Sequence, residues 1–296
     1  MTPIETLLVE VQDALTGLAT FWHDLLERKR SRPTKRSQAS RDWGSEFGVS
    51  IHTAYSSASL FLESSAEYLE CLGRVLVQPL PQKGILFLCR GVVENGARSW
   101  WLLPPGSGGS VRERARRGLL ERLHDVQELI AFTVATEDPD AERDLQNLKS
   151  RRDGMFDDGR RFGFEVRTKR PFTVDGLARP TATKLMREIN GVDGVLLYKF
   201  LSGSVHGTTY ALLQGMDVEG ATERWEGGLL VGPDDRLSPI DWVVAATVDL
   251  YCEALDRYLR AMGWPLVRWA RRKQEIMVTM RRLLEAGGSA PRRLLR

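Results

Sequence analysis

The sequence is poor in cysteine and histidine. Its 296 residues include three cysteines, Cys71, Cys89 and Cys252, and four histidines. The cysteines are odd in number, far apart and without a Cys-x-x-Cys pair, so neither a disulfide framework nor a zinc knuckle is indicated. Each lies in apolar helical sequence, where a buried free thiol is expected. Since no histidines have paired ligand spacing, we expect neither a metal site nor a cofactor.

A long uncharged apolar run is also absent. A membrane-spanning helix needs about 20 such residues, and the best candidate, 85–103, is interrupted by Arg90, Glu94 and Arg98. The N-terminus has Glu5 where a secretion signal would carry positive charge. We therefore expect a cytoplasmic protein without a membrane partner.

The charge balance excludes little by itself. The net charge of +3 is too small to imply a nucleic-acid partner. The basic residues are concentrated, however: the segment 28–41 holds seven of them and no acidic residue, and 292–296 adds three arginines. Segment 28–41 is either a solvated charged loop, the commoner meaning of such a run, or a contact for phosphate groups.

Hydrophobic periodicity predicts helices along most of the chain. Apolar residues at spacings of three and four indicate helices over 4–30, 51–78, 85–103 and 195–216, and over 240–262 and 265–286. Ser110 with Glu113 fits a capping box for a helix reaching about 136. Asp138-Pro139 opens another helix to about 159, and Thr181 caps a short one to 189. The stretch 160–180 is charged and irregular.

These elements predict an all-α fold. We expect a helical bundle of about eight helices with one short β-hairpin near 222–238, where two Gly-containing turns occur. The simplest organisation is a single helical domain over 1–296. Within it, Pro33, Gly44 and Gly48 predict a mobile basic loop over 31–50, and 287–296 forms a basic C-terminal tail.

A charged stripe runs along the apolar helix predicted for 85–103. Arg90, Glu94 and Arg98 follow at intervals of four and share one face. Ionised groups in such surroundings need partners, because an unpaired buried charge costs several kcal/mol. A structural Arg–Glu–Arg ladder satisfies this need and is the favoured interpretation. Alternatively, the stripe lines a polar cavity and presents guanidinium groups to an anion.

A second polar stripe occupies the helix predicted for 195–216. Tyr198, Ser202, His206 and Thr209 lie beside its core-facing strip, with Lys199 next to His206. Histidine titrates near physiological pH, so general acid–base chemistry is conceivable here. A serine four residues before a histidine on one helix is a poor nucleophile–base pair, because both side chains point the same way. A structural histidine bonded to Ser202 or Glu94 is slightly favoured.

The two stripes together carry a family resemblance. Arg90-Gly-Val-Val-Glu94 followed by Tyr198-x-x-x-Ser202-x-x-x-His206-Gly207 resembles uncharacterised bacterial all-helical proteins related to the HEPN superfamily, over about 86–207. Many members are ribonucleases in which a homodimer assembles an Arg-x(4–6)-His motif. The resemblance implies a stress or defence role, and it assigns the role of the motif's histidine to His206. The basic residue at the matching distance is Lys199, which lacks the bidentate fork of arginine.

Three functions follow as hypotheses. The first is a HEPN-like homodimer that binds or acts on RNA or nucleotides, with His206 as acid/base or hydrogen-bonding group and Lys199 and Arg90 holding phosphate. The second is an enzyme or binding protein for a small anionic ligand. Its inter-helix pocket would be lined by Arg90, Glu94, Arg98, Tyr198, Ser202 and His206. The third is a non-catalytic interaction scaffold that uses the hairpin and the basic loop.

Overall fold

The computed structural model describes residues 2–29, 32–77, 82–105, 109–136, 141–206, 223–225, 228–230 and 240–287. These residues form an all-α fold, as predicted, with two small antiparallel sheets. The helices are α1 (Pro3–Lys29), α2 (Gln38–Trp43), α3 (Gly48–Leu76), α4 (Gln82–Leu102), α5 (Val111–Ala135), α6 (Ala141–Arg161), α7 (Ala182–Val205), α9 (Ile240–Met262) and α10 (Leu266–Ala286). The strands are β1 (Val166–Arg167), β2 (Thr173–Val174), β3 (Leu177–Ala178), β4 (Glu223–Trp225) and β5 (Gly228–Leu230).

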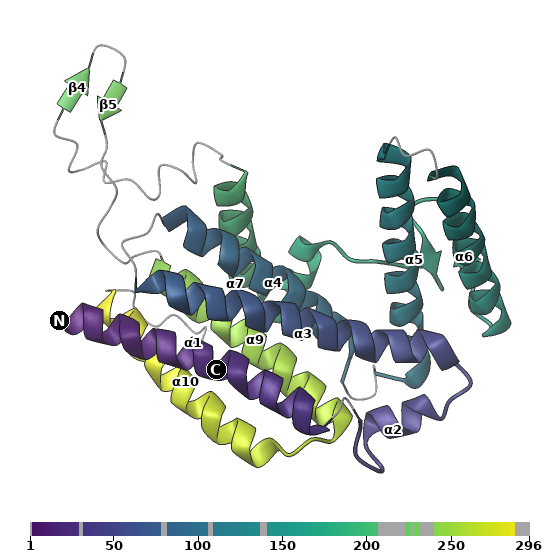
Figure 1. Cartoon of the computed structure of the whole chain (residues 1–296), viewed down its shortest axis with the longest axis horizontal. Helices are drawn as coiled ribbons and strands as arrows, with labels where there is room; N and C mark the ends of the chain where they lie inside the picture. Colours follow the sequence, from purple (N-terminus) through teal and green to yellow (C-terminus); the bar gives the residue numbers. More distant parts are fainter. Residues whose placement is uncertain are drawn as a thin grey trace.

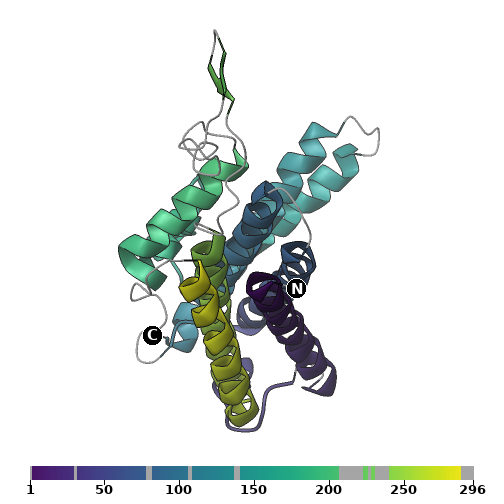
Figure 2. The same ribbon diagram turned by 90° about the vertical axis from the view of Figure 1, so that its left-hand side faces the viewer.

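The long helices pack side by side in one bundle (Figure 1). α3 packs on α1 and α4, and α9 packs on α4 and α10. α7 lies against α4, and the antiparallel α5–α6 pair extends from one end of α3. The quarter-turned view shows α7 and the α5–α6 pair on different sides of the bundle axis (Figure 2). α4 therefore has a central position, as its apolar sequence predicted.

One continuous cluster of buried apolar side chains runs from α1 to α10. α9 is its most enclosed element, with 17 of 23 residues buried. Three tryptophans, Trp22, Trp264 and Trp269, are among the largest side chains fully removed from solvent. A helix that is apolar on nearly every side is expected to be enclosed by its neighbours.

Two helices begin directly after the capping residues that the sequence predicted. The Ser110 hydroxyl accepts a hydrogen bond from the Glu113 amide at 3.0 Å, and the Thr181 hydroxyl accepts one from the Lys184 amide. The predicted break between helices near 190 also exists, because Asn190 and Gly191 have non-helical angles inside α7 and Gly191 has a φ of +60°. That conformation costs glycine little. The kink sets the direction of the α7 segment that carries Tyr198 and His206.

The segment 31–50 differs from the irregular loop that was predicted. It contains α2 and the first turn of α3, and Ala39, Asp42 and Phe47 are buried. Both oxygens of the Asp42 carboxylate accept hydrogen bonds from Arg114 on α5, and the Tyr55 hydroxyl on α3 donates to the same carboxylate at 2.6 Å. A helix of six residues is marginal alone, so these long-range bonds stabilise α2.

The basic segment is also attached to the turn between α9 and α10. The Thr34 amide donates to the carbonyl of Met262 at 3.0 Å, and the Trp264 indole donates to the carbonyl of Arg32 at 2.8 Å. Gly263 in this turn has a φ of +66°, and a Cβ placed there would lie 2.3 Å from the Thr34 hydroxyl oxygen. The turn therefore requires glycine both for its backbone and for the close approach.

The stretch 160–180, expected to be irregular, contains a three-stranded antiparallel sheet in the order β1-β2-β3. Val166 pairs with Val174, and Val174 pairs with Leu177 across a turn at Asp175-Gly176. Both turn residues have positive φ, as a tight hairpin turn requires. The hairpin predicted near 222–238 is confirmed by β4 and β5, which pair Glu223 with Leu230 and Trp225 with Gly228.

Cys89 and Cys252 are buried free thiols, as expected, but Cys71 is exposed. Burial raises the pKa of both buried thiols to about 12. In the described part of the chain, no helix combines the length and apolar character that crossing a bilayer requires. α10 ends at Ala286 with Gly287 as its C-cap, and the residues of the predicted basic tail beyond Gly287 lie outside the described residues.

Candidate functional site

The two predicted polar stripes face each other where α4 packs on α7. The Tyr198 hydroxyl on α7 donates a hydrogen bond to Oε1 of Glu94 on α4 at 2.9 Å. The same oxygen accepts a bond of 2.8 Å from Nε of Arg90, one turn earlier on α4. Glu94 therefore links the two helices and fixes the orientation of the Arg90 guanidinium.

Arg90 extends this chain of polar contacts to His206. Its Nη1 lies 3.3 Å from Nε2 of His206, across 116 residues of sequence. Arginine has no acceptor, so this contact is a hydrogen bond when Nε2 of His206 carries a lone pair and the proton resides on Nδ1. We call Arg90, Glu94, Tyr198 and His206 together the Arg90–His206 site.

The site is partly open to solvent. The Arg90 side chain is 19% exposed, that of Glu94 is 30% exposed, and His206 at the C-cap of α7 is exposed. Burial acts to lower the pKa of Arg90, but the hydrogen bond and charge of Glu94 outweigh it and raise that pKa. Burial and the neighbouring Glu94 raise the pKa of Tyr198. The tyrosine thus stays protonated and donates, while arginine stays cationic.

The other predicted residues of the α7 stripe do not join these contacts. Lys199 is exposed, and its ammonium has no hydrogen bond or ion pair among the described residues. The backbone carbonyl of Ser202 accepts from the amide of His206, but its hydroxyl has no bond to His206 in the described part of the chain. A Ser–His pair is therefore absent there. Thr209 lies outside the described residues.

Arg98 departs from the predicted Arg–Glu–Arg ladder. Its guanidinium carbon lies 5.6 Å from the centre of the Phe61 ring, and no carboxylate among the described residues forms an ion pair with it. Burial and the nearby charge of Arg179 lower the pKa of Arg98. The ladder is thus formed by Arg90 and Glu94 alone, and Arg98 faces a different neighbourhood.

That neighbourhood is a polar cluster that sequence reasoning missed. Arg179 donates two hydrogen bonds of 2.8 Å to the carboxylate of Glu121, a residue of α5 that is fully buried. His124, one turn further along α5, lines the same region. The sequence gives no sign that His124 and Arg179 line one region, because Arg179 lies in the stretch that was expected to be irregular.

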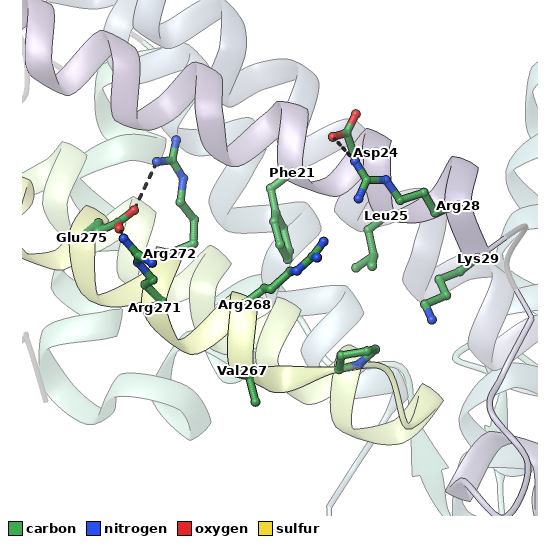
Figure 3. Close-up of a pocket in the computed structure, with 11 residues that line it drawn as sticks. Phe21, Asp24, Leu25, Arg28, Lys29, Val267, Arg268, Arg271, Arg272 and Glu275 are labelled. Carbon is green, nitrogen blue, oxygen red and sulfur yellow. Dashed lines mark hydrogen bonds and ion pairs between the residues drawn. The ribbon is translucent and has the colours of Figure 1, made fainter.

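A groove with a cavity volume of about 780 Å³ lies between the C-terminal end of α1 and the N-terminal end of α10 (Figure 3). Phe21, Leu25 and Pro265 give it apolar walls, and Arg268 reaches across it toward α1. Its two carboxylates, Asp24 and Glu275, meet five cationic side chains: Arg28, Lys29, Arg268, Arg271 and Arg272. This basic groove therefore has a net positive charge.

The described residues contain no group of three or more histidine, cysteine, aspartate or glutamate side chains able to hold a metal ion. Comparisons with known protein families, with curated proteins and with solved structures found no match to this chain.

Proposed function

We propose that the Arg90–His206 site binds a phosphate group of RNA or of a nucleotide, with His206 as the acid/base or hydrogen-bonding group. The observation that carries the proposal is the 3.3 Å contact between Nη1 of Arg90 and Nε2 of His206. An oriented guanidinium beside an exposed imidazole suits a nucleotide, because the guanidinium can donate to a phosphate oxygen while the imidazole accepts from a neighbouring hydroxyl.

The orientation of Arg90 supports this role. Glu94 holds Nε of the guanidinium, and Nη1 is directed to His206 instead. Planar, bidentate donation to phosphate is what distinguishes arginine from lysine. When a phosphate takes over Nη1 of Arg90, Nε2 of His206 is released and can accept a proton from a ribose hydroxyl.

In this proposal, Arg90 replaces Lys199 as the phosphate-holding residue. The HEPN-like resemblance placed Lys199 at the matching distance from His206 along the sequence. Arg90 reaches the histidine from another helix and supplies the fork that Lys199 lacks. A homodimer, also implied by the resemblance, remains part of the proposal, and sedimentation of the full chain measures it directly.

The basic groove would offer a polynucleotide, but not a mononucleotide, a second set of phosphate contacts away from the Arg90–His206 site. Cations at the N-terminal end of α10 lie at the positive end of the helix dipole, where they reduce helix stability. A bound phosphate backbone would offset this cost. RNA is therefore expected to bind more tightly than a nucleoside monophosphate, with an affinity that falls steeply as salt rises.

The test compares binding of a short single-stranded RNA and of a nucleoside monophosphate by the full chain and two variants. Arg90→Met and His206→Asn should each weaken binding of both probes about tenfold or more, with little loss of thermal stability. Arg187→Met, which removes an exposed cation from the first part of α7, is the matched control. Equal binding by Arg90→Met and the wild type, or no binding at low salt, rejects the proposal.

A further inference from the structure

Two adjacent cavities lie on the side of α4 that Arg98 faces. They share His124 and Arg179 as lining residues, and we call them together the Arg179 cleft. The smaller, of about 230 Å³, is lined also by Arg98 and by the start of α7. The larger, of about 330 Å³, is lined also by apolar residues of α5 and of the chain around the small sheet.

Arg179 is rigidly held in this cleft. Its Nε and Nη2 both donate to the buried carboxylate of Glu121, and its side chain is only 15% exposed. The Nη1 group has no partner among the described residues and remains available for a ligand. A bidentate arginine fixed by a buried acid is pre-organised, so little conformational entropy is lost on binding.

Arg98 lines the smaller cavity without a direct ion pair. It is half-buried over Phe61, no described carboxylate pairs with it, and Arg179 is a like charge nearby. The charges of Glu121, Glu94 and Asp125 act on Arg98 and partly offset the cost of its burial, but none of these carboxylates bonds to it. The donors of its guanidinium therefore remain available for an anion in the cavity.

The N-terminus of α7 closes the same cavity. Pro180, Thr181 and Ala182 line it, and Thr181 is the N-cap. The first amide groups of a helix lack partners within that helix and carry its positive dipole end. They add to the two arginines, which are the main attraction for an anion.

The larger cavity has a different character. Leu120, Pro171, Phe172 and Ala178 give it apolar walls, and its polar lining includes Gln127 and the opposite charges of Glu128 and Arg170. Its volume is near the lower limit of about 300 Å³ for sites that enclose small organic ligands. A molecule that fills both cavities needs an anionic head and an apolar body.

We propose that the Arg179 cleft binds a small organic oxyanion. Its phosphate or carboxylate head lies between Arg98 and Arg179 at the start of α7, and its apolar or aromatic body contacts Phe172. This site is separate from the Arg90–His206 site and does not depend on RNA binding.

The test is calorimetric titration of the full chain with three probes: inorganic phosphate, phenyl phosphate and benzoate. Phenyl phosphate should bind at least about tenfold more tightly than inorganic phosphate, because only it fills the apolar cavity. Comparison of phenyl phosphate with benzoate shows which head is preferred. If no probe binds at millimolar concentration, or if inorganic phosphate binds as tightly as phenyl phosphate, the proposal is wrong.

Arg98→Met tests the charged end, since it keeps the apolar stem over Phe61. It should weaken phenyl phosphate binding about tenfold or more, with little change in the stability of the free protein. The matched control is Arg152→Met, because Arg152 also lies over a phenylalanine ring, at 5.9 Å from Phe156, but pairs with Asp153 outside the cleft. Unchanged affinity in Arg98→Met overturns the proposal, as does marked destabilisation with wild-type affinity.

Phe172→Leu tests the apolar end. It should weaken binding of phenyl phosphate and leave inorganic phosphate binding unchanged, because the head does not contact this ring. Equal effects on both probes would contradict the assigned orientation.

Discussion

Asp42 and Arg114 form a buried ion pair that joins two segments 72 residues apart, with Nε–Oδ2 at 2.6 Å and Nη2–Oδ1 at 2.8 Å. Their side chains are 6% and 4% exposed. Tyr55 donates to the same aspartate, so α2, α3 and α5 meet at one carboxylate. The pair explains why a basic segment rich in helix breakers is held against the bundle.

Removal of one partner should be strongly destabilising. Asp42→Ala leaves the Arg114 guanidinium buried without a counter-charge, and we expect a loss of about 3–5 kcal/mol in the free energy of unfolding. Urea denaturation monitored by circular dichroism measures it. Glu70→Ala, which removes the partner of the exposed Arg74, should cost less than about 1 kcal/mol. Similar losses in both variants would show that the buried pair has no special role.

Glu94→Gln separates a structural role of the charged stripe from a ligand-binding role. The Arg90–Glu94 pair is partly solvent-exposed, so we expect the variant to lose only about 1 kcal/mol of stability. The neutral amide oxygen of glutamine holds the guanidinium less firmly than the carboxylate does, and affinity for RNA should fall about tenfold. Thermal unfolding and filter binding measure the two effects. Loss of folding with unchanged RNA affinity of the folded fraction would favour a purely structural role.

Asp249 makes the stability depend on pH. Burial, opposed by Lys273 and aided by Glu253, raises the pKa of this carboxyl to about 6 in the folded protein. The folded state therefore binds the proton more tightly than the unfolded state, and the associated stability is lost as pH rises from about 4 to about 6. At pH 7, Asp249→Asn should be more stable than the wild type by about 1 to 3 kcal/mol.

Urea unfolding at several pH values measures this difference. It should grow between pH 4 and 6 and level off above pH 7. Asp193→Asn, at an exposed position of α7, is the control and should show no such trend. A stability gain in Asp249→Asn that does not change with pH would contradict the raised pKa assigned to Asp249.

Gly263→Ala should detach the basic segment from the α9–α10 turn. The new alanine would have to adopt an unfavourable positive φ, and its Cβ would also clash with Thr34 and Ser37. We expect a loss of at least about 2 kcal/mol, and faster proteolysis after Lys35 or Arg36. At Gly176 the φ is +73° but no atom lies within 4 Å of the new Cβ, so Gly176→Ala should cost only about 1 kcal/mol. Equal losses of stability in the two variants would show that backbone strain accounts for the whole effect and that the clash contributes nothing.

The helices were largely determined by local sequence. The periodicity of 240–262 predicted α9 with its observed bounds, and Ser110 and Thr181 cap the helices that their positions indicated. Spacings of four also predicted that Arg90 and Glu94 share a face, and they form an ion pair. These features depend on residues within a few turns of one another, so the sequence reveals them.

Tertiary structure decided which polar groups meet. α2 is stabilised by Arg114, which lies 72 residues away in the sequence. The small sheet depends on the pairing of strands on both sides of the Asp175-Gly176 turn, and the sequence alone did not predict that pairing. Arg90 lies beside His206 while Lys199 is exposed, and Arg98 lies over Phe61 without an ion pair to Glu94. Such partners are separated by tens of residues or more, and the packing of whole helices brings them together. Periodicity gives the face on which a side chain lies, whereas only the assembled bundle determines what that face contacts.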